Sequence, residues 1–258
     1  MASLGSASIV AVIPARYQSS RLPGKPLADI CGRPMIEHVY RRAAAAPSVE
    51  AVVVATDDRR IVEAVENFGG LAVMTSPLHR SGSDRLAEVA EHLVCELVVN
   101  VQGDEPLIEP RVIEAAIAPF RSEASLPIST LCRRITDPAD LANPNVVKVV
   151  TSRQGYALYF SRAPVPFDRR GWSEQSRAFR HLGLYVFRRE ALMRFARLEP
   201  GELERAESLE QLRALEHGMP IRVVETTAES IGVDTAEDLE RVRRLAALTG
   251  MEASDGQQ

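Results

Sequence analysis

A short loop near the start of the chain carries three cations. The apolar run 8–13 is followed by the segment PARYQSSRLPGKP, which contains Arg16, Arg21 and Lys25. Guanidinium and ammonium groups bind phosphate oxygens, and the backbone N–H groups of such a loop add further donors. The segment has neither the G-x-G-x-x-G spacing of dinucleotide-binding loops nor the G-x-x-x-x-G-K-[ST] spacing of the usual NTPase loop. It therefore predicts a polyphosphate site of another type, with a solvated basic loop as the alternative.

Two aspartates stand at positions that could carry chemistry. Asp104 follows Gly103 directly after the apolar run 97–101, and Asp234 stands just before the helical segment 236–248. Mg²⁺ prefers one or two carboxylates together with phosphate oxygens and water. Asp104 therefore suits a metal site opposite the basic loop, with an ordinary turn aspartate as the alternative. Taken locally, Asp234 is a helix N-cap.

The first half of the chain alternates apolar runs of strand length with segments of helical period. We expect strands over 8–13, 51–55, 71–74 and 97–101, the first two of them buried, and helices over 34–43, 58–68, 83–93 and 110–120. This order predicts a largely parallel sheet covered by helices, with Pro34 as a first helical residue and Ser83 as an N-cap. Ligands bind outside the carboxyl ends of parallel strands, which is where the basic loop and Asp104 lie.

From about residue 128 the pattern changes, because strand-like runs follow one another with little helix between them. We expect strands over 128–131, 146–150, 156–160, 183–187 and 221–225, and helices over 190–197, 203–217 and 236–248. An antiparallel region of this kind can cover a site or form a dimer. We expect the polar tail 252–258 to be disordered.

The composition narrows the classes of partner. The 258 residues carry a formal net charge of −4, and a weakly acidic chain is a poor general binder of nucleic acid or anionic membranes. No apolar run approaches the ~18 residues that a membrane-spanning helix needs. Three scattered cysteines, Cys31, Cys95 and Cys132, suit neither a disulfide framework nor a thiolate metal site. We therefore expect a cytoplasmic protein with small-molecule partners and no nucleic-acid or membrane partner.

Taken together, the motifs resemble one enzyme family. In chain order they read ARYxSxRLPGKPL, ATDD, HRSGSDR, NVQGDEP, NPNVVKVV, YFSR, RHLGLY, LEQLR and GVDTAEDL. From about Ile9 to Arg244 this order strongly resembles the 3-deoxy-D-manno-octulosonate (Kdo) cytidylyltransferases. The first loop alone would indicate only the wider nucleotidyltransferase superfamily, whereas the motifs of the second half indicate the Kdo enzymes.

The resemblance implies a fold and an activity. The implied fold is α/β: a single three-layer nucleotidyltransferase domain over residues 8–248, with a mixed, mostly parallel central sheet and a small dimerisation or lid subdomain. Residues 8–125 would mainly bind CTP, and residues 126–235 would bind the sugar and form a homodimer. The implied enzyme is a cytidylyltransferase that transfers the CMP moiety of CTP to Kdo. Its products are CMP-Kdo, for lipopolysaccharide biosynthesis, and pyrophosphate, and its cofactor is Mg²⁺.

The resemblance also implies roles for individual residues. The catalytic residues would be Lys25, Arg16, Asp104 and Asp234, of which Asp104 and Asp234 would hold the metal. The CTP-binding residues would be Arg16, Ser19, Arg21, Lys25, Ser81 and Ser83. The sugar-binding residues would be Gln102, Arg162, His181, Tyr185, Glu210 and Gln211. Ser83 stands where the family motif has a threonine, so the hydroxyl is kept.

Several alternatives stay open on the sequence alone. A related enzyme acting on a sialic acid or a hexose phosphate would share the first loop but not the motifs YFSR, RHLGLY and LEQLR. A non-catalytic nucleotide-binding module would not need a pair of metal-binding acids together with Lys25. The sequence does not separate Kdo from its 8-amino analogue, and it identifies neither the number of Mg²⁺ ions nor a general base.

Overall fold

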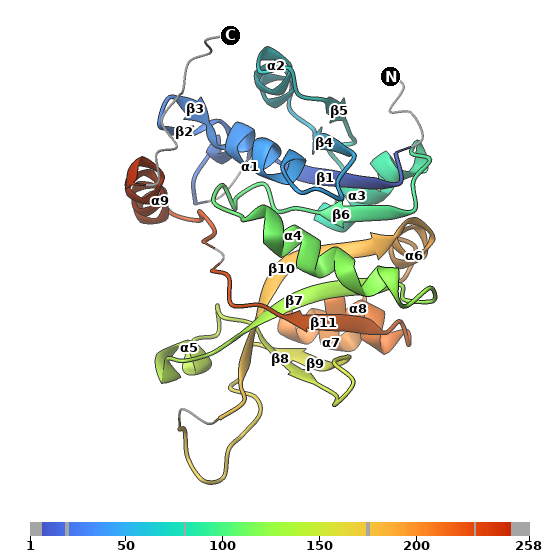
Figure 1. Ribbon diagram of the computed structural model, residues 1–258, viewed down its shortest axis with the longest axis vertical. Helices are drawn as coiled ribbons and strands as arrows, with labels where there is room; N and C mark the ends of the chain where they lie inside the picture. Colours follow the sequence, from blue (N-terminus) through green and yellow to red (C-terminus); the bar gives the residue numbers. More distant parts are fainter. Residues whose placement is uncertain (1–6, 19–20, 80, 174–175, 230, 249–258) are drawn as a thin grey trace. The chain divides into compact units, whose positions relative to one another are not determined.

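The computed structural model describes residues 7–18, 21–79, 81–173, 176–229 and 231–248 (Figure 1). The expected CTP-binding residue Ser19 and the expected disordered tail 252–258 lie outside the described residues. The chain divides into two compact units, unit 1 (Met1–Ile113 with Ser230–Gln258) and unit 2 (Glu114–Glu229). Each unit is described by itself.

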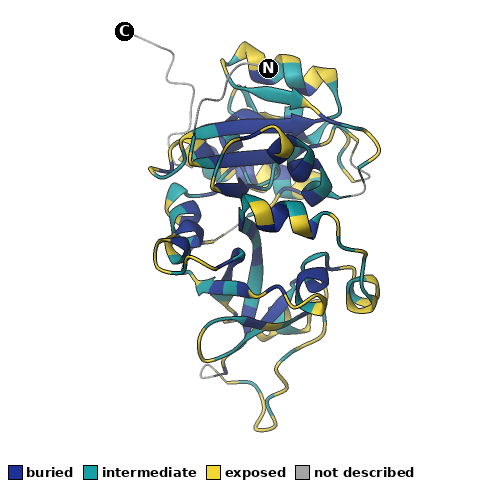
Figure 2. Cartoon of the chain, turned by 90° about the vertical axis from the view of Figure 1, so that its right-hand side faces the viewer, coloured by how far each residue is buried: buried dark blue, intermediate teal, exposed yellow. Residues whose placement is uncertain are grey.

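Unit 1 contains a parallel sheet built from the expected apolar runs. Its strands are β1 (Ile9–Ala15), β4 (Ala51–Thr56), β5 (Ala72–Met74) and β6 (Leu97–Asn100), in the order β6-β1-β4-β5. Strands covered on both faces read as continuous runs of β-branched residues, which explains why the sequence pattern found them. Most residues of β1, β4 and β6 are buried, whereas β5 at the edge of the sheet is intermediate to exposed (Figure 2). The predicted parallel arrangement of this half is confirmed.

Helices and two short strands complete unit 1. The helices are α1 (Met35–Ala44), α2 (Arg59–Asn67), α3 (Gly82–Glu91) and α9 (Ala236–Leu248), with the start of α4 (Pro110–Ile117). The turn η1 (Lys25–Leu27) and the short strands β2 (Asp29–Ile30) and β3 (Arg33–Pro34) follow the basic loop. Two predicted helix starts are wrong. Helix α1 begins after Pro34, which is extended, and Ser81 rather than the buried Ser83 caps α3.

Unit 2 is mixed. Its strand β7 (Ile128–Arg134) pairs antiparallel with β10 (Phe179–Arg188) and parallel with β11 (Ile221–Glu225). Strand β8 (Lys148–Thr151) pairs antiparallel with both β10 and β9 (Ala157–Ser161), as the predicted change of pattern requires. The remaining elements are η2 (Ala118–Arg121), α5 (Pro138–Ala142), α6 (Arg189–Phe195), α7 (Glu202–Glu207) and α8 (Gln211–Glu216).

The single helix expected over 203–217 is wrong. The structure has two helices there, α7 and α8, because Ser208 between them adopts a left-handed conformation with φ of 51°. That conformation interrupts the α-helical hydrogen bonding.

Within the described part of the chain, no helix has both the length and the apolar character needed to cross a bilayer.

Candidate active site

The basic loop of unit 1 is folded tightly against its own tyrosine. Gly24 has φ of +72°, and its N–H donates to the carbonyl of Tyr17 at 2.9 Å. A Cβ at Gly24 would meet the Tyr17 ring at 3.2 Å, so glycine suits both the backbone angle and the space. The turn ends in η1, whose first residue is Lys25. Only 14% of the Lys25 side chain is exposed.

Lys25 meets both predicted metal-binding acids. Its Nζ lies 2.7 Å from Asp104 Oδ2 and 3.4 Å from Asp234 Oδ1. Arg21 Nη2 lies 3.0 Å from the same oxygen of Asp234. These groups line a pocket of about 340 Å³ together with Pro14, Ala15, Arg16, Gln18, Pro26, Gln102 and Gly103. The structure therefore brings Lys25 together with acids that lie 79 and 209 positions away in the sequence.

A close backbone approach fixes the position of Asp104. A Cβ on the preceding Gly103 would lie 2.8 Å from the carbonyl oxygen of Pro14, at the end of β1. Only a residue without a side chain fits there unless the backbone moves. The expectation that this glycine permits close approach is confirmed.

Asp234 reaches the pocket from the other end of the chain. The N–H of Val233 donates to the carbonyl of Asp104 at 2.9 Å, and Val233 packs in a core with Ile30 and Met35. The start of α9 is capped by Thr235 and Asp238, whose side chains each accept from the other's backbone N–H, at 3.2 and 2.9 Å. The Asp234 carboxylate is not used as the cap, so it is available for the pocket.

The pair Asp104 and Asp234 has the donor chemistry that Mg²⁺ requires. One cationic atom, Lys25 Nζ, is already within 3.4 Å of both carboxylates, so a single small cation can reach both. Among the described residues no group of three or more histidine, cysteine, aspartate or glutamate side chains could hold a metal. A two-carboxylate site leaves the other coordination positions for phosphate oxygens and water, as Mg²⁺ prefers.

Arg16 is held by the loop that precedes α3. Its Nη2 donates to the carbonyls of His79 and Ser81 at 2.9 and 3.2 Å. Ser81 and Ser83 are not among the residues lining the pocket: the Ser81 hydroxyl accepts from the N–H of Asp84 at 3.1 Å, and Ser83 is buried. Their assignment to CTP binding stays a prediction.

Glu88, Arg85 and Asp57 support the segment before α3, and they were not identified from the sequence. Glu88 accepts from the N–H of Ser76 at 2.9 Å and bonds to the His79 ring. Burial would raise the pKa of Glu88, but these two hydrogen bonds outweigh it and lower the pKa. The fully buried Arg85 contacts Asp57 Oδ2 at 2.7 Å and the hydroxyl of Thr75. The motifs ATDD and HRSGSDR carry Asp57 and Arg85, and they were the available signal.

Unit 2 brings together three of the predicted sugar-binding residues, His181, Tyr185 and Glu210. The rings of His181 and Tyr185 lie 5.3 Å apart between centroids, and the Phe160 ring stands edge-on to His181 at 5.0 Å. Burial lowers the pKa of His181 to about 3. Burial, together with the charge of Glu210, raises the pKa of Tyr185 well above its usual value. Both rings are therefore neutral over the ordinary pH range. Gln102, by contrast, lies in unit 1 and lines the pocket of Lys25.

Arg162 is surrounded by backbone carbonyls. Its Nε donates to Glu207 at 2.7 Å, its Nη1 to Pro144 at 3.0 Å and its Nη2 to Ser208 at 3.4 Å. Arg162 thus stabilises the turn between α7 and α8, which is followed by Glu210 and by Gln211, the first residue of α8. Its predicted pairing with a sugar carboxylate stays a prediction.

Glu207 was missed in the sequence, and it supports the same segment. It accepts from the Ser161 hydroxyl at 2.6 Å and from the N–H of Arg162 at 2.9 Å.

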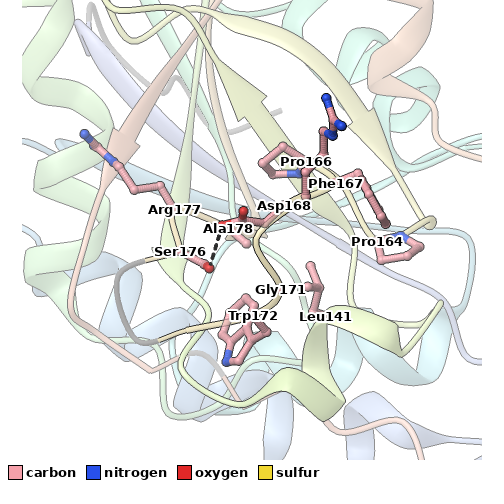
Figure 3. Close-up of a pocket in the computed structure, with 11 residues that line it drawn as sticks. Leu141, Pro164, Pro166, Phe167, Asp168, Gly171, Trp172, Ser176, Arg177 and Ala178 are labelled. Atoms are coloured by element: carbon pink, nitrogen blue, oxygen red, sulfur yellow. Dashed lines mark hydrogen bonds between the residues drawn. The ribbon is translucent and has the colours of Figure 1, made fainter.

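A second pocket, of about 430 Å³, lies in unit 2 (Figure 3). Trp172 lines it, and the ring packs against a small core of Ile135, Val146 and Ala178. The Asp168 carboxylate of this pocket is held by Arg170 and by the hydroxyl of Ser176 at 3.1 Å. The Asp168 carboxylate is thus used within the loop itself, and we assign no chemistry to this pocket.

Comparisons with known proteins agree with the geometry. A family model described as cytidylyltransferase matches residues 10–226. The 3-deoxy-manno-octulosonate cytidylyltransferase of Geobacter sulfurreducens is 56% identical over 244 residues, which cover 91% of this chain and 98% of its own. That of Geobacter metallireducens is 56% identical over 243 residues, with 91% and 96% covered.

Solved structures agree in fold. A structure of CMP:2-keto-3-deoxy-manno-octonic acid synthetase complexed with CTP matches with a TM-score of 0.90 at 48% identity, covering 94% of this chain and 99% of its own. A 4-diphosphocytidyl-2C-methyl-D-erythritol synthase from Anaerococcus prevotii, at 13% identity and a TM-score of 0.61, shares the fold alone. The predicted α/β class, with its mixed, mostly parallel sheet and helices on both sides, is confirmed, whereas the dimerisation subdomain stays a prediction. The chain belongs to the cytidylyltransferase family and, within it, to the 3-deoxy-manno-octulosonate cytidylyltransferases.

Proposed function

We propose that this enzyme transfers the CMP moiety of CTP to Kdo, giving CMP-Kdo and pyrophosphate for lipopolysaccharide biosynthesis. The observation that carries the proposal is the contact of Lys25 with both Asp104 and Asp234, 2.7 and 3.4 Å away, at the carboxyl ends of parallel strands. A cation flanked by two acids in such a pocket suits a triphosphate with a divalent metal. The high identity to enzymes with this name supports the choice of substrates.

The reaction is a substitution at the α-phosphorus of CTP. The anomeric hydroxyl oxygen of Kdo forms the new P–O bond, the bond to the β-phosphate oxygen breaks, and the hydroxyl proton is lost to solvent or a base. Such reactions need alignment of the groups and neutralisation of charge more than covalent help from the protein. Lys25, Arg16 and Arg21 supply three positive charges around one pocket. They stabilise the charge that develops on the departing pyrophosphate.

We propose that Asp104 and Asp234 hold Mg²⁺ in the loaded enzyme. When bound, Mg²⁺ would neutralise phosphate charge and favour the ionised form of a hydroxyl beside it. The two acids hold the ammonium of Lys25 between them, so Lys25 is placed next to any anion drawn to this site. Gly103 keeps Asp104 close to the end of β1, because its lack of a side chain allows the approach to Pro14.

We propose that unit 2 supplies the groups that bind the sugar acid. His181 and Tyr185 are neutral hydrogen-bonding rings, and Glu210 is the acidic group beside Tyr185. Neutral rings and one carboxylate suit the many hydroxyls of an eight-carbon sugar. Arg162 and Gln211 complete the unit 2 set, with Arg162 as the cation for the sugar carboxylate.

We further propose a homodimer located in the cytoplasm. Leu158 and Phe167 of unit 2 are 62% and 83% exposed, which is surface that a partner subunit would cover. Cys31, Cys95 and Cys132 form no disulfide bond, as is usual in a reducing compartment.

The test is an assay of the purified protein with Mg²⁺, CTP and Kdo, in which pyrophosphate and CMP-Kdo are both measured. Parallel reactions replace Kdo by its 8-amino analogue, a sialic acid or a hexose phosphate. We expect turnover with Kdo and loss of turnover when EDTA removes the metal. Binding of CTP without release of pyrophosphate for any sugar would contradict the proposal and support a non-catalytic module. Faster turnover of the 8-amino analogue would change the substrate but not the reaction.

A further inference from the structure

Strand β10 loses its regular pairing with β7 in the middle of the motif RHLGLY. Leu182 pairs with Leu131, and the next pair is Tyr185 with Thr130. Strand β10 thus advances three residues while β7 advances one, so Gly183 and Leu184 form a bulge. Bulges bend a strand and redirect its side chains, and they are common beside active sites.

The bulge brings His181 and Tyr185 into contact. Four residues along a regular strand span roughly 13 Å at a rise of about 3.3 Å each. The two ring centroids are only 5.3 Å apart, so the two side chains turn toward each other across the bulge. The hydroxyl oxygen of Tyr185 is buried without a hydrogen-bond partner within the described structure, and it is thus a group that a ligand can satisfy.

One buried hydroxyl lies at the centre of this bulge. Thr130 is fully buried, and its Oγ1 lies 2.8 Å from the carbonyl oxygen of Leu184 and 3.2 Å from that of Leu182. The same oxygen lies 2.9 Å from Nε2 of His181. Thr130 therefore connects both carbonyls of the bulge to the histidine ring.

The protons of this cluster can be assigned from its chemistry. Backbone carbonyls only accept hydrogen bonds, and a hydroxyl has a single proton to donate. If the Thr130 hydroxyl donated its proton to His181, both carbonyl oxygens would face lone pairs of the hydroxyl oxygen, which is unfavourable. The hydroxyl therefore donates to Leu184, the nearer carbonyl, and accepts from Nε2–H of His181. This arrangement leaves Nδ1 as the acceptor atom of the His181 ring.

We propose that Thr130 is a positioning residue of the sugar-acid site: it holds His181 in the Nε2–H tautomer, so that Nδ1 accepts a hydrogen bond from a hydroxyl of the sugar. This inference rests on the proposed function for the role of His181 as a sugar ligand. The Phe160 ring, edge-on at 5.0 Å, restricts the His181 ring from another side. A histidine held this way selects a hydroxyl donor, and it does not act as a cation for the sugar carboxylate.

The first experiment determines the tautomer directly. Long-range ¹H–¹⁵N NMR spectra of ¹⁵N-histidine-labelled protein at pH 7 distinguish protonated from unprotonated ring nitrogens, and a His181→Gln variant assigns the signal. We expect a protonated Nε2 and an unprotonated Nδ1 in the wild-type protein. We expect this pattern to be kept in Thr130→Ser, which retains the hydroxyl, and lost in the nearly isosteric Thr130→Val. A wild-type His181 protonated at Nδ1 would overturn the proposal, whatever the variants do.

The second experiment measures the consequence for substrate use. We expect Thr130→Val to raise the KM for Kdo about two- to tenfold, the effect of one neutral hydrogen bond, with CTP affinity by calorimetry unchanged and Thr130→Ser near wild type. Ser129→Ala is the matched control. It removes the neighbouring buried hydroxyl of β7, which bonds to the carbonyl of Ala116. It should lower the melting temperature without changing the His181 tautomer or the KM for Kdo.

The outcomes separate this inference from the proposed function. If Thr130→Val lowers only the melting temperature, as Ser129→Ala does, Thr130 is a packing residue and the inference is wrong. If wild-type protein fails to turn over Kdo, the proposed function and the sugar-binding role of Nδ1 are both wrong. The NMR spectrum still decides in that case whether Thr130 sets the tautomer.

Discussion

Replacing Asp234 by asparagine separates a metal ligand from a helix cap. The substitution keeps the size of the side chain and removes its charge. In the folded protein this carboxylate is half exposed (48%) and contacts Lys25 at 3.4 Å and Arg21 at 3.0 Å. Exposed ion pairs contribute about 0–1 kcal/mol, and the cap of α9 is made by Thr235 and Asp238 instead. We therefore expect Asp234→Asn to change the free energy of unfolding by less than about 1 kcal/mol.

The same substitution should have a large effect on the reaction. A metal ligand contributes several kcal/mol of transition-state stabilisation, and about 3–4 kcal/mol corresponds to roughly a hundredfold to a thousandfold in rate. Asp104→Asn should cause a loss of similar size. The double variant should be little slower than either single variant, because we propose that both acids hold the same metal ion.

The assays are pyrophosphate release at saturating CTP and Kdo and thermal unfolding of the same samples. Thr235→Val is the matched control, because it removes the cap hydroxyl that bonds to Asp238 and is not among the residues lining the pocket. It should lower stability by about 0.5–2 kcal/mol and leave most of the activity. The reasoning is refuted if Asp234→Asn keeps a near-normal rate and instead melts earlier, as the control does.

Three further predictions concern other parts of the chain. Gly103→Ala should slow the reaction at least tenfold, because its Cβ would lie 2.8 Å from the carbonyl of Pro14 and Asp104 would have to move; Gly232→Ala, with open space around it, is the control in the same kinetic assay. Arg162→Ala should raise the KM for Kdo about ten- to a hundredfold, the loss of a charge-assisted hydrogen bond of ~1.5–3 kcal/mol. In that variant CTP binding by calorimetry should change little, and Arg162→Lys should recover only part of the loss; equal weakening of CTP binding would contradict this division of roles. Because burial lowers the pKa of His181 to about 3, the folded protein resists a proton that the unfolded chain accepts below about 6.5. Stability should therefore fall as the pH drops from about 6.5 to 5, and urea unfolding should show a smaller fall for His181→Gln.

The parallel sheet of unit 1 was predictable because its physics is local. Strands buried on both faces must be apolar throughout, so β1, β4 and β6 stand out as continuous runs. Once the strands are parallel, the loops at their carboxyl ends share one edge, and the meeting of Lys25 with Asp104 follows. The position of Asp234 could not be derived in this way. It depends on the packing of Val233 and α9 against Ile30 and Met35, which no local pattern reveals.

The largest error has its cause in long-range contacts. The segment 203–217 has a helical pattern, but the carbonyls of Glu207 and Ser208 bond to Arg162, directly after β9, and Ser208 turns left-handed. Ser81 and Ser83 are both good cap residues, and the local capping box of Ser81 with Asp84 makes Ser81 the cap. Gly183 in RHLGLY was a visible sign of a bulge. The partner that completes the bulge, Thr130, lies more than 50 positions away.

Some cations at the two predicted sites are used in different ways, and the difference helps explain which roles the sequence could reveal. In the pocket of unit 1, Lys25 and Arg21 pair with carboxylates that are 32–48% exposed. We expect such pairs to exchange partners when the proposed triphosphate and metal bind. Beside the predicted sugar-binding residues of unit 2, Arg162 and the buried Lys148 instead donate to backbone oxygens, and Lys148 does so to Asn143 and Arg162, 2.9 and 2.6 Å away.

Charges bonded to the backbone set the shape of a site rather than its electrostatic field. Burial lowers the pKa of Lys148. Its two hydrogen bonds, to the carbonyls of Asn143 and Arg162, hold the segments that carry these residues in place. Besides the charged Arg162 and Glu210, the sugar-binding set that we propose for unit 2 consists of neutral donors and acceptors, such as His181 and Tyr185, whose direction depends on the bulge. Residue type alone suffices to predict a site for a highly charged triphosphate. A site for a sugar with many hydroxyls depends on the direction of each hydrogen bond, and direction is a property of the folded chain.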